Sequence, residues 1–188
     1  MDFLNSIILL TNFIIVPGIT YGSQLALGAI GVTLIYGVLR FANFAYGDLM
    51  AFGTMIVILV TWFLQSKGIT FGLLPTALLA LPVGIILTIA VSLFFDKTVF
   101  EYYRNKKSDP VTFIVVSLGI MFVLNAVVRI IIGPNDINFM DGHKFIMKAR
   151  EFKQLTGLNE GLALKSTQVI TLVTTIITCS ILFYFLNK

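Results

Sequence analysis

Hydrophobic and polar positions divide the chain into long apolar runs separated by short polar stretches. Several of these runs approach or exceed the roughly 20 residues that a membrane-spanning helix needs, and none alternates as barrel strands do. A shorter apolar run, residues 6–16, comes before them. The pattern predicts an all-α polytopic transmembrane helical bundle of about five to six helices. The long runs cover approximately residues 20–39, 49–64, 71–95, 111–133 and 168–186.

The short run is followed at once by Pro17 and Gly18. Proline lacks a backbone donor and its ring clashes with the preceding turn of a helix. The Pro-Gly pair therefore predicts that a helix over residues 6–16 ends or kinks at this point.

Composition agrees with a membrane protein and narrows the function. The 188 residues are 57% hydrophobic and 12% charged, whereas a soluble domain carries roughly 25% charged residues. The net charge of +4 lies in connecting segments and is not a nucleic-acid signal. One histidine, His143, and one cysteine, Cys179, give no metal cluster and no disulfide framework. We expect no metal, cofactor or nucleic-acid partner, and no enzymatic site, because no phosphate-binding glycine loop or nucleophile–base pair is found.

Two polar connections flank the apolar run 111–133 and so lie on opposite sides of the membrane. Residues 96–110 form a short, densely basic loop, whereas residues 134–167 are longer and mixed in charge. Because membrane orientation follows Lys and Arg in short loops, we place 96–110 in the cytoplasm and 134–167 outside. Lys188 then lies at the cytoplasmic face. The basic residues of the short loop include Arg104, Lys106 and Lys107.

A compact polar block interrupts the apolar pattern at residues 40–48, within VLRFANFAYGDLMAFG. It is either an ordinary turn between two helices or a break in a helix at membrane depth, which is tolerated where backbone lines a cavity. The following run, 49–64, favours the break because 16 residues reach only about 24 Å, less than the ~30 Å hydrocarbon core. In a break, Asn43 is a hydrogen-bonding or helix-breaking residue, Gly47 permits the break, and Asp48 caps the next helix or faces its positive end.

Polar positions in the apolar runs also share helix faces. Ser117, Met121, Asn125 and Arg129 follow one another at steps of four residues. Asn125 either makes an interhelical hydrogen bond or lines a path, and Arg129 extends to the interface. The face of Gly22 and its small neighbours either packs on another helix or lines a substrate path. Threonines 171, 174, 175 and 178 are expected to bond carbonyls of their own helix.

Two stretches then resemble a known family. GITYGSQLALGAIGVTLIYGVLRFANFAYGDLMAFG, residues 18–53, resembles the opening of the permeases of bacterial branched-chain amino acid ABC transporters. The family's block of Asn-Phe-Ala-His-Gly and an acidic residue is Asn43 to Asp48 here, with Tyr46 in place of the histidine. Residues 100–135 more loosely resemble the family's basic cytoplasmic loop and the helix after it.

The resemblance implies a single transmembrane permease domain, residues 1–188, which is the N-terminal part of a longer multi-pass permease of the bacterial inner membrane. It implies a second permease subunit, two cytosolic ATPase subunits and a soluble substrate-binding protein, and it places the break at 40–48 in the translocation core. Urea and short-chain amide permeases share the block, so they remain an alternative, as does a non-transporting membrane scaffold or passive channel. The candidate path residues are Gly22, Asn43, Tyr46, Gly47, Asp48 and Asn125.

Overall fold

The computed structural model describes residues 2–69, 74–133, 135, 139, 145–147, 149–156 and 161–187. They form two compact units. The first is built from residues 1–30, 73–75 and 142–188, and the second from residues 31–72 and 76–141. Predicted features at His143 and Lys188 lie outside the described residues, as does part of the predicted connection 134–167.

Within the described residues, five helical stretches are long and apolar enough to cross a membrane, which confirms the predicted all-α transmembrane class. Their ends mostly match the apolar runs, because bilayer thickness sets both. The stretches are Asn5–Leu39, Ala45–Ser66, Ala77–Asn105, Pro110–Ile132 and Ser166–Leu186.

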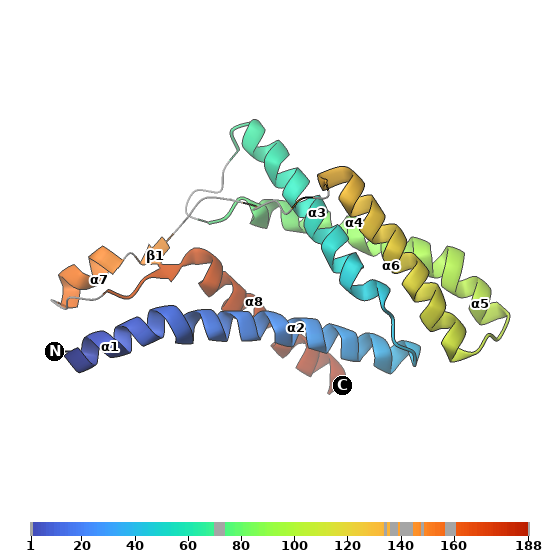
Figure 1. Ribbon diagram of the computed structural model, residues 1–188, viewed down its shortest axis with the longest axis horizontal. Helices are drawn as coiled ribbons and strands as arrows, with labels where there is room; N and C mark the ends of the chain where they lie inside the picture. Colours follow the sequence, from blue (N-terminus) through green and yellow to red (C-terminus); the bar gives the residue numbers. More distant parts are fainter. Residues whose placement is uncertain are drawn as a thin grey trace. The chain divides into compact units, whose positions relative to one another are not determined.

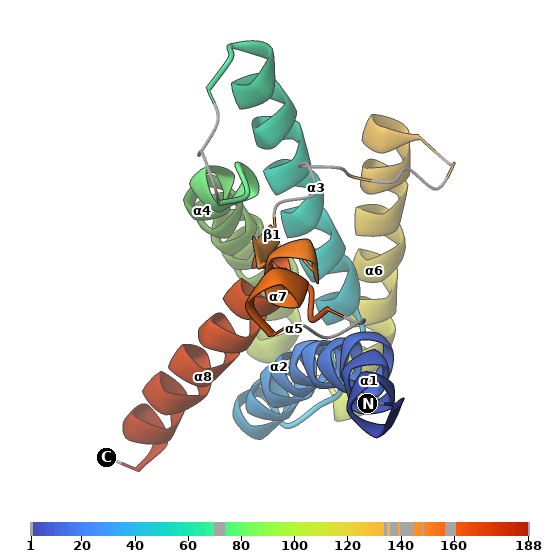
Figure 2. The same cartoon turned by 90° about the vertical axis from the view of Figure 1, so that its left-hand side faces the viewer.

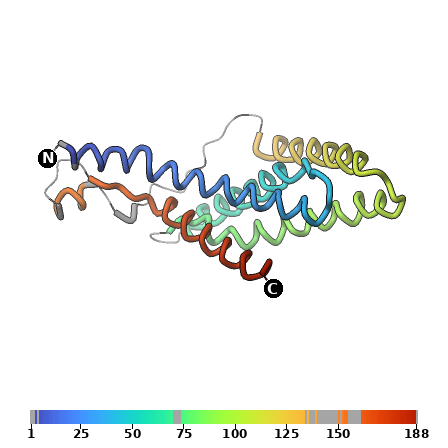
Figure 3. Tube along the Cα trace, turned by 90° about the horizontal axis from the view of Figure 1, so that it is seen from below, coloured from blue at the N-terminus to red at the C-terminus, as the bar shows by residue number. Residues whose placement is uncertain are grey.

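The first stretch corrects one half of the expectation that a helix ends or kinks at Pro17, because the helix does not end there. α1 (Asp2–Leu10) continues through a π-helical turn, η1 (Thr11–Ile15), into α2 (Val16–Leu39). The Val16 N–H bonds to the carbonyl of Thr11, five residues back. A wider turn of this kind just before a proline accommodates the missing donor and the ring. The helix therefore runs on without a stop, as the tube in Figure 3 shows.

A second correction concerns residues 96–110, predicted as a connecting loop. α4 (Ala77–Phe95), which contains Pro82, continues through the π-turn η2 (Asp96–Phe100) into α5 (Glu101–Asn105). Only residues 106–109 are non-helical before α6 (Pro110–Ile132) begins. The chain has no glycine or proline between 96 and 105 to end the helix, so charge alone does not make a loop here.

The second unit is organised around α3 (Ala45–Ser66), which packs against both α4 and α6. In Figures 1 and 2, α3 and α6 run in the same direction and α4 runs opposite to both. Buried residues join the start of α3 to α6, to the end of η2 and to the segment before α3. This core comprises Phe41, Ala45, Phe100, Ile120 and Leu124.

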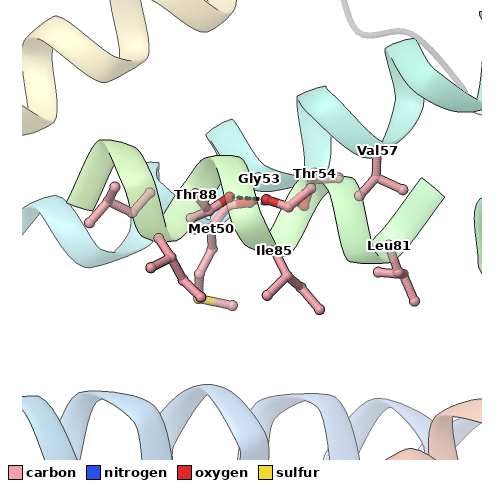
Figure 4. A pocket seen from close by; sticks show the side chains of 10 residues that line it. Met50, Gly53, Thr54, Val57, Leu81, Ile85 and Thr88 are labelled. Atoms are coloured by element: carbon pink, nitrogen blue, oxygen red, sulfur yellow. Dashed lines mark hydrogen bonds between the residues drawn. The ribbon is translucent and has the colours of Figure 1, made fainter. Parts of the chain in front are cut away.

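Two glycines set the close crossing of α3 and α4. A Cβ added to Gly84 would strike the Cγ2 of Val57 and come within 3.3 Å of the Gly53 carbonyl oxygen. A Cβ on Gly53 would lie 2.6 Å from the Thr88 hydroxyl. Small residues at such crossings let backbones approach in a membrane. An apolar groove of about 450 Å³ lies beside this contact, lined from both helices (Figure 4).

The first unit contains α8 (Ser166–Leu186), the short helix α7 (Ala149–Thr156), and an antiparallel pair of strands, β1 (Phe145–Met147) and β2 (Leu164–Lys165). In the strand register Phe145 pairs with Lys165, and Met147 pairs with Leu164. The sequence pattern does not predict this pair. Threonines 171, 174, 175 and 178 of α8 donate to carbonyls of their own helix at 2.7–2.9 Å, as expected.

Candidate functional site

The polar block adopts a break between two helices. α2 ends at Leu39 and α3 begins at Ala45, so residues 40–44 alone are non-helical. Arg40 takes the left-handed conformation there, with φ at 59°, and its N–H bonds to the Tyr36 carbonyl oxygen at 2.9 Å. Gly47 lies inside α3 and its φ is not positive. The expectation that Gly47 permits the break is therefore wrong, because the reversal is made at the end of α2.

Side chains on both sides of the break satisfy the backbone donors that a helix start leaves open. The Ala45 N–H donates to the Asn43 Oδ1 at 3.1 Å, which gives Asn43 the hydrogen-bonding role that its position predicts. The Phe44 N–H donates to the Ser117 hydroxyl of α6 at 3.1 Å. That hydroxyl is fully buried and donates in turn to the Ile114 carbonyl oxygen at 2.7 Å. Donors satisfied by protein are what a break in hydrocarbon requires.

An aromatic cluster fixes the first half of the break. The ring of Phe41 lies 5.1 Å from that of Phe113 and 5.7 Å from that of Phe100, measured between centroids. Phe41 is buried, with 7% of its surface exposed. Each such aromatic pair stabilises by ~0.5–1.5 kcal/mol beyond area burial. The break is consequently part of the core of the unit.

The position of the break along α6 follows from these contacts. Phe113 and Ser117 are three and seven residues past Pro110, about 4 and 10 Å along a helix rising 1.5 Å per residue. The break thus lies beside the first two turns of α6 and not beyond its end. The apolar run after the break is not short, contrary to the expectation from the sequence, because α3 has 22 residues and is long enough to cross a membrane. It starts earlier than predicted since Ala45 to Asp48 are helical.

A polar relay joins α3 to α6 just past the break. The amide Nδ2 of Asn125 donates to the Asp48 Oδ1 at 2.9 Å, and its Oδ1 accepts from the Arg129 Nε at 2.8 Å. Asp48 lies in the first turn of α3, where a negative charge suits the helix dipole. The amide therefore connects a carboxylate to a guanidinium, and Asn125 makes the interhelical hydrogen bond that was one of its two alternatives.

A cavity of about 490 Å³ lies on the other side of the break, against the end of α2. The residues that line it come from the end of α2, the break and the start of α3: Val32, Thr33, Ile35, Tyr36, Ala42, Asn43, Phe44, Tyr46 and Gly47. The Tyr46 hydroxyl lies where a Cβ on Gly31 would stand, so a larger residue at position 31 would require the Tyr46 side chain to move. The sequence gives no sign of this contact. Ser117 is expected on the polar face that it shares with Asn125, but the sequence assigns no role to Ser117 or Arg40.

The remaining candidates are separate from this cavity. Gly22 is exposed on α2 in the first unit, and nothing lies within 4 Å of a Cβ built on it. Arg104 belongs to α5, where its guanidinium bonds to both carboxylate oxygens of Asp96 at 2.7 and 2.8 Å. Lys106 and Lys107 form the turn after α5, and hydrogen bonding to Tyr102 raises the pKa of Lys106. No group of three potential metal ligands occurs among the residues that the structure describes.

Comparison with known proteins decides the family. The family model described as "Branched-chain amino acid transport system / permease component" matches residues 14–188. The chain belongs to this permease family. Its membrane-spanning helices and its polar block are thus those of a multi-pass membrane protein of the branched-chain amino acid permease class.

Individual relatives are distant. The high-affinity branched-chain amino acid transport system permease protein LivH of Escherichia coli K12 is 30% identical over 121 residues, 64% of this chain and 38% of the relative. The corresponding BraD protein of Pseudomonas aeruginosa is 32% identical over 92 residues, 48% of this chain and 29% of the relative. The chain thus spans less than two-fifths of the length of these relatives. No solved structure matches it significantly.

Proposed function

We propose that the chain is a membrane-spanning permease subunit that carries branched-chain amino acids across the bacterial inner membrane. ATP hydrolysis would occur on separate cytosolic ATPase subunits, and a second permease subunit and a soluble substrate-binding protein would complete the importer. Family membership and the names of the LivH and BraD relatives support this assignment.

The observation that carries the proposal is the break at residues 40–44 with a cavity beside it. In transporters, broken helices place polar backbone and side chains at a substrate site. Here the break is tied to α6 by Ser117, and the cavity of about 490 Å³ falls in the range of ligand pockets, ~300–1,000 Å³. Asn43, Tyr46 and Gly47 would line the path, and Asp48 and Asn125 would hold α3 and α6 together beside it.

The proposed mechanism is alternating access around this break. α3 is fastened to α6 through Ser117 and Asn125, and to α4 through the glycine crossing. These three helices would move as one body, while the cavity faces the end of α2. Motion of α2 against that body would open and close the cavity, in keeping with the rocking of helix bundles in transporters.

Gly47 gives a direct test. Nothing lies within 4 Å of a Cβ built on it, so Gly47→Val adds a side chain beside the cavity with a Cβ that meets no other atom. Liposomes holding the chain with the partner subunits would be assayed for ATP-dependent uptake of labelled leucine. We expect Gly47→Val to lower uptake about tenfold or more, equivalent to ~1.4 kcal/mol, because it fills the path.

Gly119→Val is the matched control, since Gly119 is an exposed mid-helix glycine of α6 with nothing within 4 Å of its Cβ. Equal uptake by the two variants would contradict the placement of the path. Competition by unlabelled leucine, isoleucine and valine supports the substrate class. Competition by urea or acetamide instead would assign the chain to the urea and short-chain amide branch, and ATP-independent leak would favour a channel.

A further inference from the structure

A second cavity lies at the start of the break, beside Arg40 and Phe41. It measures about 300 Å³ and is formed by the end of α2, the last turn of α5 and the first turn of α6. Its polar groups are the side chains of Arg40, Arg104 and Ser108. Its apolar walls are Val38, Leu39, Phe41, Pro110 and Phe113. One cavity thus combines two guanidinium groups with a wall of aliphatic and aromatic carbon.

The two arginines differ in how their charge is balanced. Arg104 holds Asp96 through two hydrogen bonds, and a guanidinium has five donors, so three donors of Arg104 stay available. Arg40 has no carboxylate partner among the residues that the structure describes. Lys106 and Lys107 follow in the adjacent turn. Asp96, Glu101 and Asp109 lie in the same stretch of chain and offset three of the four positive charges of Arg40, Arg104, Lys106 and Lys107, which leaves a net charge of +1.

Arg40 has a backbone conformation that is unfavourable for arginine, with φ at 59°. Its left-handed conformation is unfavourable for a residue with a Cβ, and glycine is the usual residue at such a helix end. Phe41, next in the chain, is locked into the aromatic stack with Phe113 and Phe100. The backbone of Arg40 is consequently held next to the apolar residues that line the cavity.

We propose that this cavity binds the phosphate-bearing headgroup of an anionic phospholipid, with Arg40 as the principal cation. Arginine recognises phosphate through paired donors, and basic pockets between membrane helices bind anionic headgroups. The apolar walls fit the glycerol and upper acyl carbons, which a free phosphate ion lacks. The site lies at the start of α6, a helix long and apolar enough to cross a membrane, and lipid headgroups lie at the ends of such helices.

The test measures lipid binding to the whole chain in detergent by native mass spectrometry. Phosphatidylglycerol and phosphatidylcholine with identical acyl chains are titrated separately, and inorganic phosphate is titrated in a third arm. The variants are Arg40→Gln, Arg40→Lys and the control Lys67→Gln. Lys67 follows α3 at its other end, is exposed, and carries the same charge.

We expect Arg40→Gln to weaken phosphatidylglycerol binding about fivefold, the effect of one basic residue near a charged surface. Arg40→Lys and Lys67→Gln should retain binding, and phosphatidylcholine affinity should not respond to Arg40. Equal losses in Arg40→Gln and Lys67→Gln would overturn the site, because they would report only overall charge. Inorganic phosphate binding as tightly as phosphatidylglycerol would overturn the lipid assignment. If circular dichroism shows that Arg40→Gln does not fold, Arg40→Gly, which suits the backbone, replaces it.

Discussion

Replacing Gly84 by alanine tests how tightly α3 and α4 are packed. The added Cβ strikes the Val57 Cγ2 and lies 3.3 Å from the Gly53 carbonyl oxygen. Val57 has one strongly preferred rotamer in a helix, and a backbone carbonyl cannot turn aside, so the helices must separate. Overpacking of this kind costs about 1–3 kcal/mol.

The matched control is Gly119→Ala in α6. Both glycines lie inside helices, so both variants gain up to ~1 kcal/mol in helix propensity. Of the two, only Gly84 has atoms within 4 Å of the added Cβ. In Gly119→Ala no clash offsets the gain in helix propensity. We therefore expect this variant to be as stable as the unchanged chain or slightly more stable. Gly84→Ala should be less stable than Gly119→Ala by about 1–3 kcal/mol.

The chain's single tryptophan makes the measurement direct. Trp62 lies on α3, the helix whose packing is altered. Its fluorescence would follow unfolding in mixed micelles as the fraction of denaturing detergent rises. If Gly84→Ala unfolds at the same detergent fraction as Gly119→Ala, α3 and α4 do not approach as closely as the structure places them.

Three further predictions concern the break and the orientation of the chain. Arg40→Gly should be more stable than Arg40→Ala by about 1 kcal/mol in the same unfolding assay, because only glycine adopts a φ of 59° without strain; equal stabilities would argue against that conformation. A double-mutant cycle of Asp48→Ala and Asn125→Ala should give a coupling of ~0.6–1.7 kcal/mol, the range for interhelical hydrogen bonds in membranes, whereas strict additivity would mean that the 2.9 Å contact contributes nothing. A reporter that works only in the cytoplasm should be active when fused after Lys107, since the turn is basic. Activity only of a reporter that works outside the cytoplasm would contradict the proposed orientation.

The sequence predicts the membrane helices well where lipid alone decides the pattern. The apolar runs must match bilayer thickness, and the helix ends at Leu39, Ile132 and Leu186 follow from it within a few residues. The errors arise where local signals compete with continuing a helix. Pro17 is absorbed by a π-turn, and the charged residues 96–105 stay helical because nothing breaks the hydrogen-bond ladder.

The site was predictable by residue type but not by arrangement. Asn43, Asp48 and Asn125 were marked because polar groups in apolar runs need partners. Their actual partners depend on how α3 meets α6, which one sequence does not give. Gly31 illustrates the limit: glycine is common in membrane helices, and only the position of the Tyr46 hydroxyl shows what a side chain at this position would meet.

The helical part of the polar block, residues 45–48, lies on α3, and the helix period decides which neighbour each residue faces. Ala45, Asp48, Leu49 and Phe52 recur at three- and four-residue spacing and face α6 and the core. Tyr46 and Gly47, between them, face the cavity beside α2, and Gly53 faces α4. One helix therefore divides its surface among a core contact, a cavity wall and a close crossing. Asn43 and Ser117 accept hydrogen bonds from the Ala45 and Phe44 N–H groups, so protein side chains satisfy these donors at the break.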